Sequence, residues 1–175
     1  MIKPILQLGN ELLRKKASRI NNFDNKSLEN LVRDLSDTLN EAQKRFCYGR
    51  GIAAPQIGES KRIALIGTPS FRSPLVNPKI INASTRKFEI WDSCFSFNTT
   101  FFVLIDRHYK ITVEYFDMKG ERHTVEAENK LSELLQHEID HLDGILVTDR
   151  MKHRKGIMMR SEWIRNFKTC TCKKK

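Results

Sequence analysis

The chain has 175 residues, of which 39% are hydrophobic, and a formal net charge of +10. Its length suits one domain with a sizeable core, and its apolar and charged fractions are those of a soluble globular protein. The N-terminal stretch has no apolar segment of signal-peptide length, and the longest apolar run, residues 101–105, is far too short to span a membrane, so we expect a cytoplasmic protein with no membrane contact.

The first predicted element is a helix over residues 27–46. Apolar residues recur there at spacings of three and four, which is the period of an amphipathic helix. Gly49 and Gly51 follow, and they indicate a tight loop after the helix.

The middle of the chain changes to β-rich runs at residues 61–67, 74–81, 101–117 and 121–127, and residues 117–120 (DMKG) predict a hairpin turn. Residues 130–143 return to a helical pattern, with Gly144 as a candidate C-cap. A helix, several strands and a second helix, with few parallel crossovers, predict a single α+β domain.

Two histidines and a glutamate on the second helix suggest a metal site. His137 and His141 are four residues apart, so both side chains lie on one face of the helix and can share a Zn²⁺- or Fe²⁺-sized ion. Glu138 follows the first histidine and can reach a water on that ion as general base.

The residues leave the third ligand open. Val147 stands where one class of metalloprotease has its third histidine, so that pattern fails. Glu162 is a downstream carboxylate that would suit a zinc endoprotease. Cys94 is an upstream thiolate, and thiolates favour zinc or iron over hard cations.

A second unusual stretch is YGRGIAAPQIG, residues 48–58. Its glycines let the backbone approach a ligand, and Gln56 offers an amide at the end of a turn of small residues. Alone, this stretch is also compatible with an ordinary turn between a helix and a strand.

Three motifs in this order resemble those of the peptide deformylases, which remove the N-formyl group from nascent bacterial or organellar proteins. The family motif G-x-G-x-A-A-x-Q is matched in full by residues 49–56, and Q-H-E-x-D-H-L-x-G is matched in full by residues 136–144. The middle motif, E-G-C-L-S or E-S-C-L-S, is matched in part by Asp92-Ser93-Cys94-Phe95-Ser96. The resemblance extends over about residues 1–152.

The resemblance implies an α+β fold in which antiparallel strands pack around a metal-binding helix. It implies that Cys94, His137 and His141 bind the metal, often Fe²⁺ in this family and sometimes Zn²⁺ or another divalent transition metal.

The resemblance also implies the reaction, which is hydrolysis of formyl-Met at the N-terminus of nascent proteins to give formate. Glu138 would take a proton from the attacking water and later give it to the leaving amine. The side-chain amide of Gln56 and the backbone N–H of Phe95 would stabilise the oxyanion.

The substrate-binding residues implied by the resemblance are Gly51, Arg50, Ile90 and Leu134. Gly51 would let the peptide lie against the loop backbone, and Ile90 and Leu134 are the apolar candidates for a methionine pocket. Arg50 departs from the family, which usually has an apolar residue there. Its guanidinium could meet an acidic residue, the carboxylate of a short substrate, or solvent.

The sequence departs from the family motifs at Arg50, Asp92 and Phe95. These departures leave a second function open, in which a deformylase-like protein acts on or binds a different formylated substrate. A zinc endoprotease that uses Glu162 is a further alternative.

Residues 151–175 contain nine Lys and Arg and one acidic residue, whereas residues 1–150 contain 22 Lys and Arg and 20 acidic residues. We therefore divide the chain into a deformylase-like catalytic domain, residues 1–152, and a basic C-terminal tail, residues 153–175. Met159, Trp163 and Phe167 recur every four residues in this tail. The segment could contact ribosomal RNA, or it could be a helix packed on the domain with its charges outward.

Overall fold

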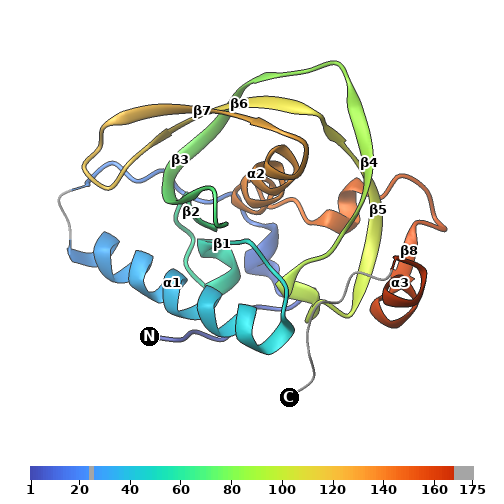
Figure 1. Cartoon of the computed structure of the whole chain (residues 1–175). Coiled ribbons are helices and arrows are strands. Elements are labelled where there is room, and N and C mark those ends of the chain that lie inside the picture. The colour runs from blue at the N-terminus through green and yellow to red at the C-terminus, as the bar shows by residue number, and fades with distance from the viewer. Residues whose placement is uncertain (24–25, 168–175) are drawn as a thin grey trace.

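The structure is a computed structural model that describes residues 1–23 and 26–167 (Figure 1). Its helices are α1 (Lys26–Phe46), α2 (Asn129–Leu142) and α3 (Arg160–Phe167). Both predicted helices are confirmed to within one residue at each end. The described residues contain no helix that is both long enough and apolar enough to cross a membrane.

Two antiparallel sheets surround α2, which lies in the middle of the molecule (Figure 1). The first sheet has the order β1-β2-β3-β6-β7, and the second has the order β4-β5-β8. The strands are β1 (Gly51–Ala53), β2 (Ile63–Gly67), β3 (Arg72–Ala83), β4 (Lys87–Asp92), β5 (Phe101–His108), β6 (Lys110–Phe116), β7 (Arg122–Glu128) and β8 (Ile157–Met159). The predicted α+β class is confirmed.

The run predicted at residues 101–117 is two strands that belong to different sheets. β5 ends at His108 and β6 begins at Lys110, so the chain passes from the second sheet to the first at Tyr109. The predicted turn joins β6 to β7, where the N–H of Gly120 donates to the carbonyl of Asp117 at 3.2 Å.

The two long helices differ in how much of their surface is buried. α1 buries one apolar stripe, which includes Leu28, Leu35 and Leu39, against the first sheet. On α2, every residue from Ser132 to Leu142 is buried, including its charged and polar side chains. Buried polar groups are costly unless they bind one another or a ligand. The interior of α2 is therefore where a functional site is expected.

Candidate metal centre and active site

Three side chains from two elements converge on one point. His137 and His141 come from α2, and Cys94 follows the end of β4. One ligand atom from each lies within 4.8 Å of the others, and Cys94 Sγ is 3.1 Å from His141 Nε2. Bonds of 2.0–2.3 Å to a tetrahedral ion place neighbouring ligand atoms roughly 3.3–3.8 Å apart. The three side chains are therefore spaced for one transition-metal ion.

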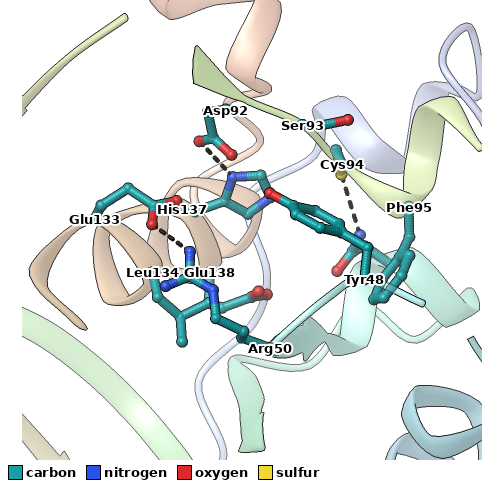
Figure 2. Close-up of a pocket in the computed structure, with 12 residues that line it drawn as sticks. Tyr48, Arg50, Asp92, Ser93, Cys94, Phe95, Glu133, Leu134, His137 and Glu138 are labelled. Atoms are coloured by element: carbon teal, nitrogen blue, oxygen red, sulfur yellow. Dashed lines mark hydrogen bonds and ion pairs between the residues drawn. The ribbon is translucent and has the colours of Figure 1, made fainter. Parts of the chain in front are cut away.

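Asp92 fixes the orientation of the first histidine. The Nδ1 atom of His137 lies 2.8 Å from Asp92 Oδ2, so that Nδ1–H donates to the carboxylate and Nε2 faces the ligand cluster (Figure 2). Burial opposes the charged imidazole, but the Asp92 carboxylate and the Cys94 sulfur together raise the pKa of His137. Such a hydrogen bond sets the tautomer of a metal-binding histidine.

A chain of buried charges continues from Asp92. Arg107, on β5, donates from Nη2 to Asp92 Oδ2 at 3.3 Å and from Nη1 to Asp140. Arg150 donates from Nη2 to the other oxygen of Asp140 at 2.6 Å. The carboxylate of Asp140 therefore links α2 to β5 through Arg107 and to the later segment that contains Arg150.

The surroundings of Cys94 favour its thiolate. Burial opposes this form, but the charge of His141 and hydrogen bonds from His137 and His141 lower the pKa of Cys94 to about 5. The N–H of Ser96 and Nε2 of Gln56 also donate to Sγ, at 3.3 and 3.4 Å. The thiolate is the form of cysteine that binds metals.

Glu138 has the properties of a general base. It is 3% exposed, and its Oε2 has no hydrogen-bond partner in the described part of the chain. Burial raises the pKa of Glu138 to about 7. A carboxylate with a pKa near neutrality can both accept and return a proton.

Asp92, Cys94, His137 and Glu138 line one small cavity of about 30 Å³. This volume is enough for one or two waters. Gln56 lies on its wall, because its Oε1 accepts the N–H of Ala53 at 2.8 Å and its Nε2 is thereby turned toward Cys94. Phe95 begins a short 3₁₀ helix, Phe95–Phe97, so its backbone N–H is one of the donors that lack a partner within that helix.

Two glycines of the first motif make room for site residues. A Cβ on Gly51 would lie 2.6 Å from Glu138 Oε1, and a Cβ on Gly49 would lie 1.9 Å from Cζ of Phe95. Glycine at position 51 therefore allows the close approach of the Glu138 carboxylate, a reason that the motif alone did not suggest.

Comparison with known proteins agrees with this geometry. The sequence profile of the family described as polypeptide deformylase matches residues 2–156. The chain belongs to this family. Peptide deformylase 2 of Nostoc sp. is 34% identical over 170 residues, which cover 91% of this chain and 92% of the relative. The peptide deformylase of Heliobacterium modesticaldum is 38% identical over 149 residues, which cover 85% and 93%.

Solved deformylase structures share the fold. The crystal structure of the Thermotoga maritima peptide deformylase has a TM-score of 0.80 and 30% identity, covering 87% of this chain and 99% of that one. The Synechococcus elongatus peptide deformylase in complex with actinonin has a TM-score of 0.80 and 28% identity, covering 98% and 90%. Peptide deformylases are metal-dependent hydrolases, and this chain is an enzyme of that class.

A divalent transition metal fits the deformylase site as its residues stand. One thiolate and two imidazoles form a donor set typical of zinc or iron. Glu138 Oε2, on the same cavity, is buried without a partner among the described residues. Glu162, the alternative ligand of an endoprotease, lies on α3, where its carboxylate accepts from Arg165 at 2.8 Å, and it belongs to none of the potential metal clusters of the described chain.

Three of the four predicted substrate residues line the cavity. Arg50, Gly51 and Leu134 line the cavity itself, whereas Ile90 lines a neighbouring groove. Arg50 takes one of the alternatives left open by the sequence, because its guanidinium forms an ion pair with Glu133 (Figure 2). It also donates to the carbonyl of Lys130 at 2.9 Å.

Sequence reasoning missed the roles of Asp92 and Arg107. Asp92 was noticed only as a departure from the family motif, although it binds both His137 and Arg107. The sequence did contain a signal for Arg107, which comes two residues after the apolar run Phe101–Ile105. An arginine that continues a buried strand is itself buried, and a buried charge needs a partner.

Proposed function

We propose that this deformylase hydrolyses the N-formyl group of formyl-Met at the N-terminus of nascent proteins and releases formate. The observation that carries the proposal is a cluster of three metal-type ligands, two of which line one cavity together with Glu138, in a chain of this family. A structure of the Acinetobacter baumannii peptide deformylase, 26% identical, has Met-Ala-Ser bound, and this peptide is the product of such a reaction.

Cys94, His137 and His141 are the proposed ligands of the metal, and Fe²⁺ is the proposed ion, with Zn²⁺ or another divalent transition metal as the alternative. When bound, the ion supplies a Lewis acid that acidifies water and polarises a carbonyl group. Asp92 holds the imidazole of His137 in the tautomer that leaves Nε2 free for this purpose.

The residues of the chain carry the proton and the developing charge. Glu138 accepts a proton from the attacking water, and the water oxygen forms the new bond to the formyl carbon. Nε2 of Gln56 and the backbone N–H of Phe95 donate to the resulting oxyanion. Glu138 then gives the proton to the leaving nitrogen as the C–N bond breaks, so that the products are formate and a free N-terminal methionine.

Arg50, Gly51, Ile90 and Leu134 are the proposed contacts of the formylated residue. The Arg50–Glu133 ion pair favours a second candidate function, which is action on, or binding of, a different formylated substrate. An ion pair between the buried Glu133 and the one-third-exposed Arg50 is a poorer surface for a methionine side chain than the apolar residue usual in the family.

We also propose that the enzyme works in the cytoplasm, with residues 1–152 as the catalytic domain and residues 153–175 as a basic tail that contacts the ribosome. Within the described residues of the tail, β8 pairs with β5, and Trp163 of α3 stacks on Phe102 of β5 at 4.3 Å between ring centroids. Residues 168–175 lie outside the described part of the chain.

Formate release from formyl-Met-Ala-Ser tests the function. The protein should be purified anaerobically with Fe²⁺, because Fe²⁺ beside a thiolate oxidises readily, and its metal content should be measured in parallel. We expect turnover in the wild type, none above background in Glu138→Ala with metal retained, and loss of metal in Cys94→Ala. A wild type that holds one metal per chain and releases no formate would contradict the formyl-Met assignment and support the second candidate.

A further inference from the structure

The chain has four cysteines, of which two lie in the described residues and two follow them. Cys94 is buried and is a free thiol, as suits a proposed metal ligand. Cys47 is exposed, and it is disulfide-bonded. The remaining cysteines, Cys170 and Cys172, lie outside the described part of the chain. Within this chain, the partner of Cys47 can therefore only be one of these two.

Cys47 stands at a position where helices commonly have glycine. It follows Phe46, the last residue of α1, and its φ of 50° lies in the left-handed region. Side chains with a Cβ are disfavoured in this region, and glycine is the usual residue just after a helix. The local backbone therefore does not explain a cysteine at this position, whereas a bond to its sulfur does.

Helix α3 lies next to the end of α1, which brings the C-terminal part of the chain close to Cys47. Arg160, the first residue of α3, donates from Nη2 to the carbonyl of Phe46 at 2.8 Å. The ring of Trp163 stacks on Phe102 of β5 with an interplanar angle of 10°, so that α3 packs beside β5 (Figure 1). The helix that leads to the last two cysteines is thus fixed against the body of the protein.

The end of α3 is within reach of Cys47. Phe167, the last residue of α3, and Cys47 line the same groove, which has a volume of about 620 Å³. The three residues from Phe167 to Cys170 can span at most about 10 Å, and the five residues to Cys172 about 17 Å. A disulfide itself adds about 5.5–6 Å between the two Cα atoms. Both cysteines can therefore reach across the groove.

A bond at Cys47 would attach the tail to the segment that leads into the active site. Tyr48 and Arg50 follow Cys47, and they line both the groove and the metal-site cavity, which is the cavity of about 30 Å³ described above. Ile90, a proposed contact of the formylated residue, also lines the groove. A tail held between Phe167 and Cys47 would therefore lie beside the proposed substrate contacts.

We propose that Cys47 and one of the two tail cysteines form a reversible disulfide, and that this bond holds the tail over the groove and hinders substrate entry into the metal-site cavity. Disulfides are rare in a reducing cytoplasm, and those that form there usually respond to the redox state. The effect on substrate entry rests on the proposed function, whereas the bond itself does not.

The bond forms by exchange with a low-molecular-weight disulfide such as oxidised glutathione. The thiolate of one protein cysteine attacks a sulfur of the oxidant, breaks its S–S bond and releases one thiol, which leaves a mixed disulfide. The thiolate of the second protein cysteine attacks the protein sulfur of the mixed disulfide and releases the second thiol. Two electrons thus pass from the protein to the oxidant, and the two protons of the protein thiols end on the released thiols. Excess reduced glutathione reverses the exchange.

The first test detects the bond in the full-length protein loaded with Zn²⁺, which does not itself undergo redox chemistry. After equilibration with oxidised glutathione, mass spectrometry of an unreduced proteolytic digest should find a peptide that contains Cys47 linked to one that contains Cys170 or Cys172. Equilibration with reduced glutathione should remove this link. The Tm of the oxidised protein should exceed that of the reduced protein by about 5–15 °C, because the bond closes a long loop in the unfolded chain.

The second test measures substrate entry. If the attached tail leaves the groove open for about a tenth of the time, oxidation should raise KM for formyl-Met-Ala-Ser about tenfold, with kcat and zinc content unchanged. Cys47→Ser, and the double variant Cys170→Ser with Cys172→Ser, should both lose this dependence on the redox state. The matched control is Thr169→Ser with Thr171→Ser, which changes the neighbours of the tail cysteines and keeps both thiols. It should respond to oxidation as the wild type does.

Three results in the digest would overturn the proposal. They are the absence of a linked peptide after oxidation, a link only between Cys170 and Cys172, and a link between two chains. A correct link with the same KM in both redox states would overturn the effect on substrate entry. If neither form releases formate, the linked peptide and the Tm still decide whether the bond exists, so failure of the proposed function is distinguished from failure of this one.

Discussion

Adding one methyl group at position 51 tests where Glu138 must lie. A Cβ on Gly51 would be 2.6 Å from Glu138 Oε1 and 2.9 Å from its Cδ, whereas ordinary contacts begin at 3.4 Å. In Gly51→Ala the carboxylate must therefore move by about 0.8 Å. The end of a flexible side chain can move at little energetic cost, so the fold and the metal ligands should be nearly unaffected.

The rate should be affected far more than the stability. A displacement of about 1 Å at a reacting group can lower the rate roughly a hundredfold. We expect a decrease of that order in kcat for formyl-Met-Ala-Ser, with metal content unchanged and only a small change in the free energy of unfolding. Formate release, metal analysis and urea denaturation of the same preparation measure the three quantities.

Gly156→Ala is the control, because a Cβ there also makes a tight contact, 3.0 Å from the carbonyl oxygen of His153, but Gly156 does not line the metal-site cavity. Its kcat should equal that of the wild type. A Gly51→Ala variant with wild-type kcat would refute the placement of Glu138 as the base against β1. A variant that has lost its metal would show that the methyl group displaces α2 as a whole.

Two further predictions concern the charged residues around the site. Asp92→Asn should weaken metal binding by about 10–100-fold, because the amide cannot replace the negative charge that orients His137. A titration with a metal chelator measures the affinity. Asp106→Asn, on the neighbouring strand, is the control, and an equal loss of affinity in that variant would contradict the prediction. Arg50→Leu should lower the free energy of unfolding by about 1–3 kcal/mol, because it leaves a buried Glu133 without its partner while Arg50 itself is one-third exposed. Most of that loss should be recovered when Glu133→Leu is added. Urea denaturation of the wild type, the two single variants and the double variant measures the coupling. Additive losses of unfolding free energy in the two single variants would contradict it.

Sequence patterns predicted the elements that have a long apolar repeat. The period of α1 and α2 is carried by many buried leucines, so the ends of both helices were placed to within one residue. β8 has only three residues, and β4 was not named as a strand although its alternation of charged and apolar side chains is a strand pattern. Their pairing with β5 depends on contacts between distant parts of the chain, which local patterns do not contain.

The same limit applies to the site. The spacing of His137 and His141 identified the candidate metal helix, because the i and i+4 geometry is local. The hydrogen bond from His137 to Asp92 depends on how far β4 extends and on how α2 is rotated against it, which the sequence does not state. The ion pair of Arg50 with Glu133 likewise joins residues 83 positions apart.

The two residues that precede the histidines explain how α2 is held at the correct rotation. Gln136 accepts the N–H of His108 at 3.1 Å and donates to its carbonyl at 3.0 Å, so it binds β5 by both ends of its amide. Asp140, one turn later, binds Arg107 of the same strand. Each of these contacts lies one residue, and therefore about 100° around the helix, from a proposed metal ligand.

Two attachments to one strand, one turn apart, prevent α2 from turning about its axis without breaking both. β5 also pairs along its length with β4, the strand that leads into Cys94. The three proposed ligands are thus positioned against a common strand although they come from two elements. Buried ion pairs contribute little net stability because desolvation offsets their attraction. The chain of charges from Asp92 through Arg107 to Asp140 is therefore better explained by the alignment of the proposed ligands than by the stability of the fold.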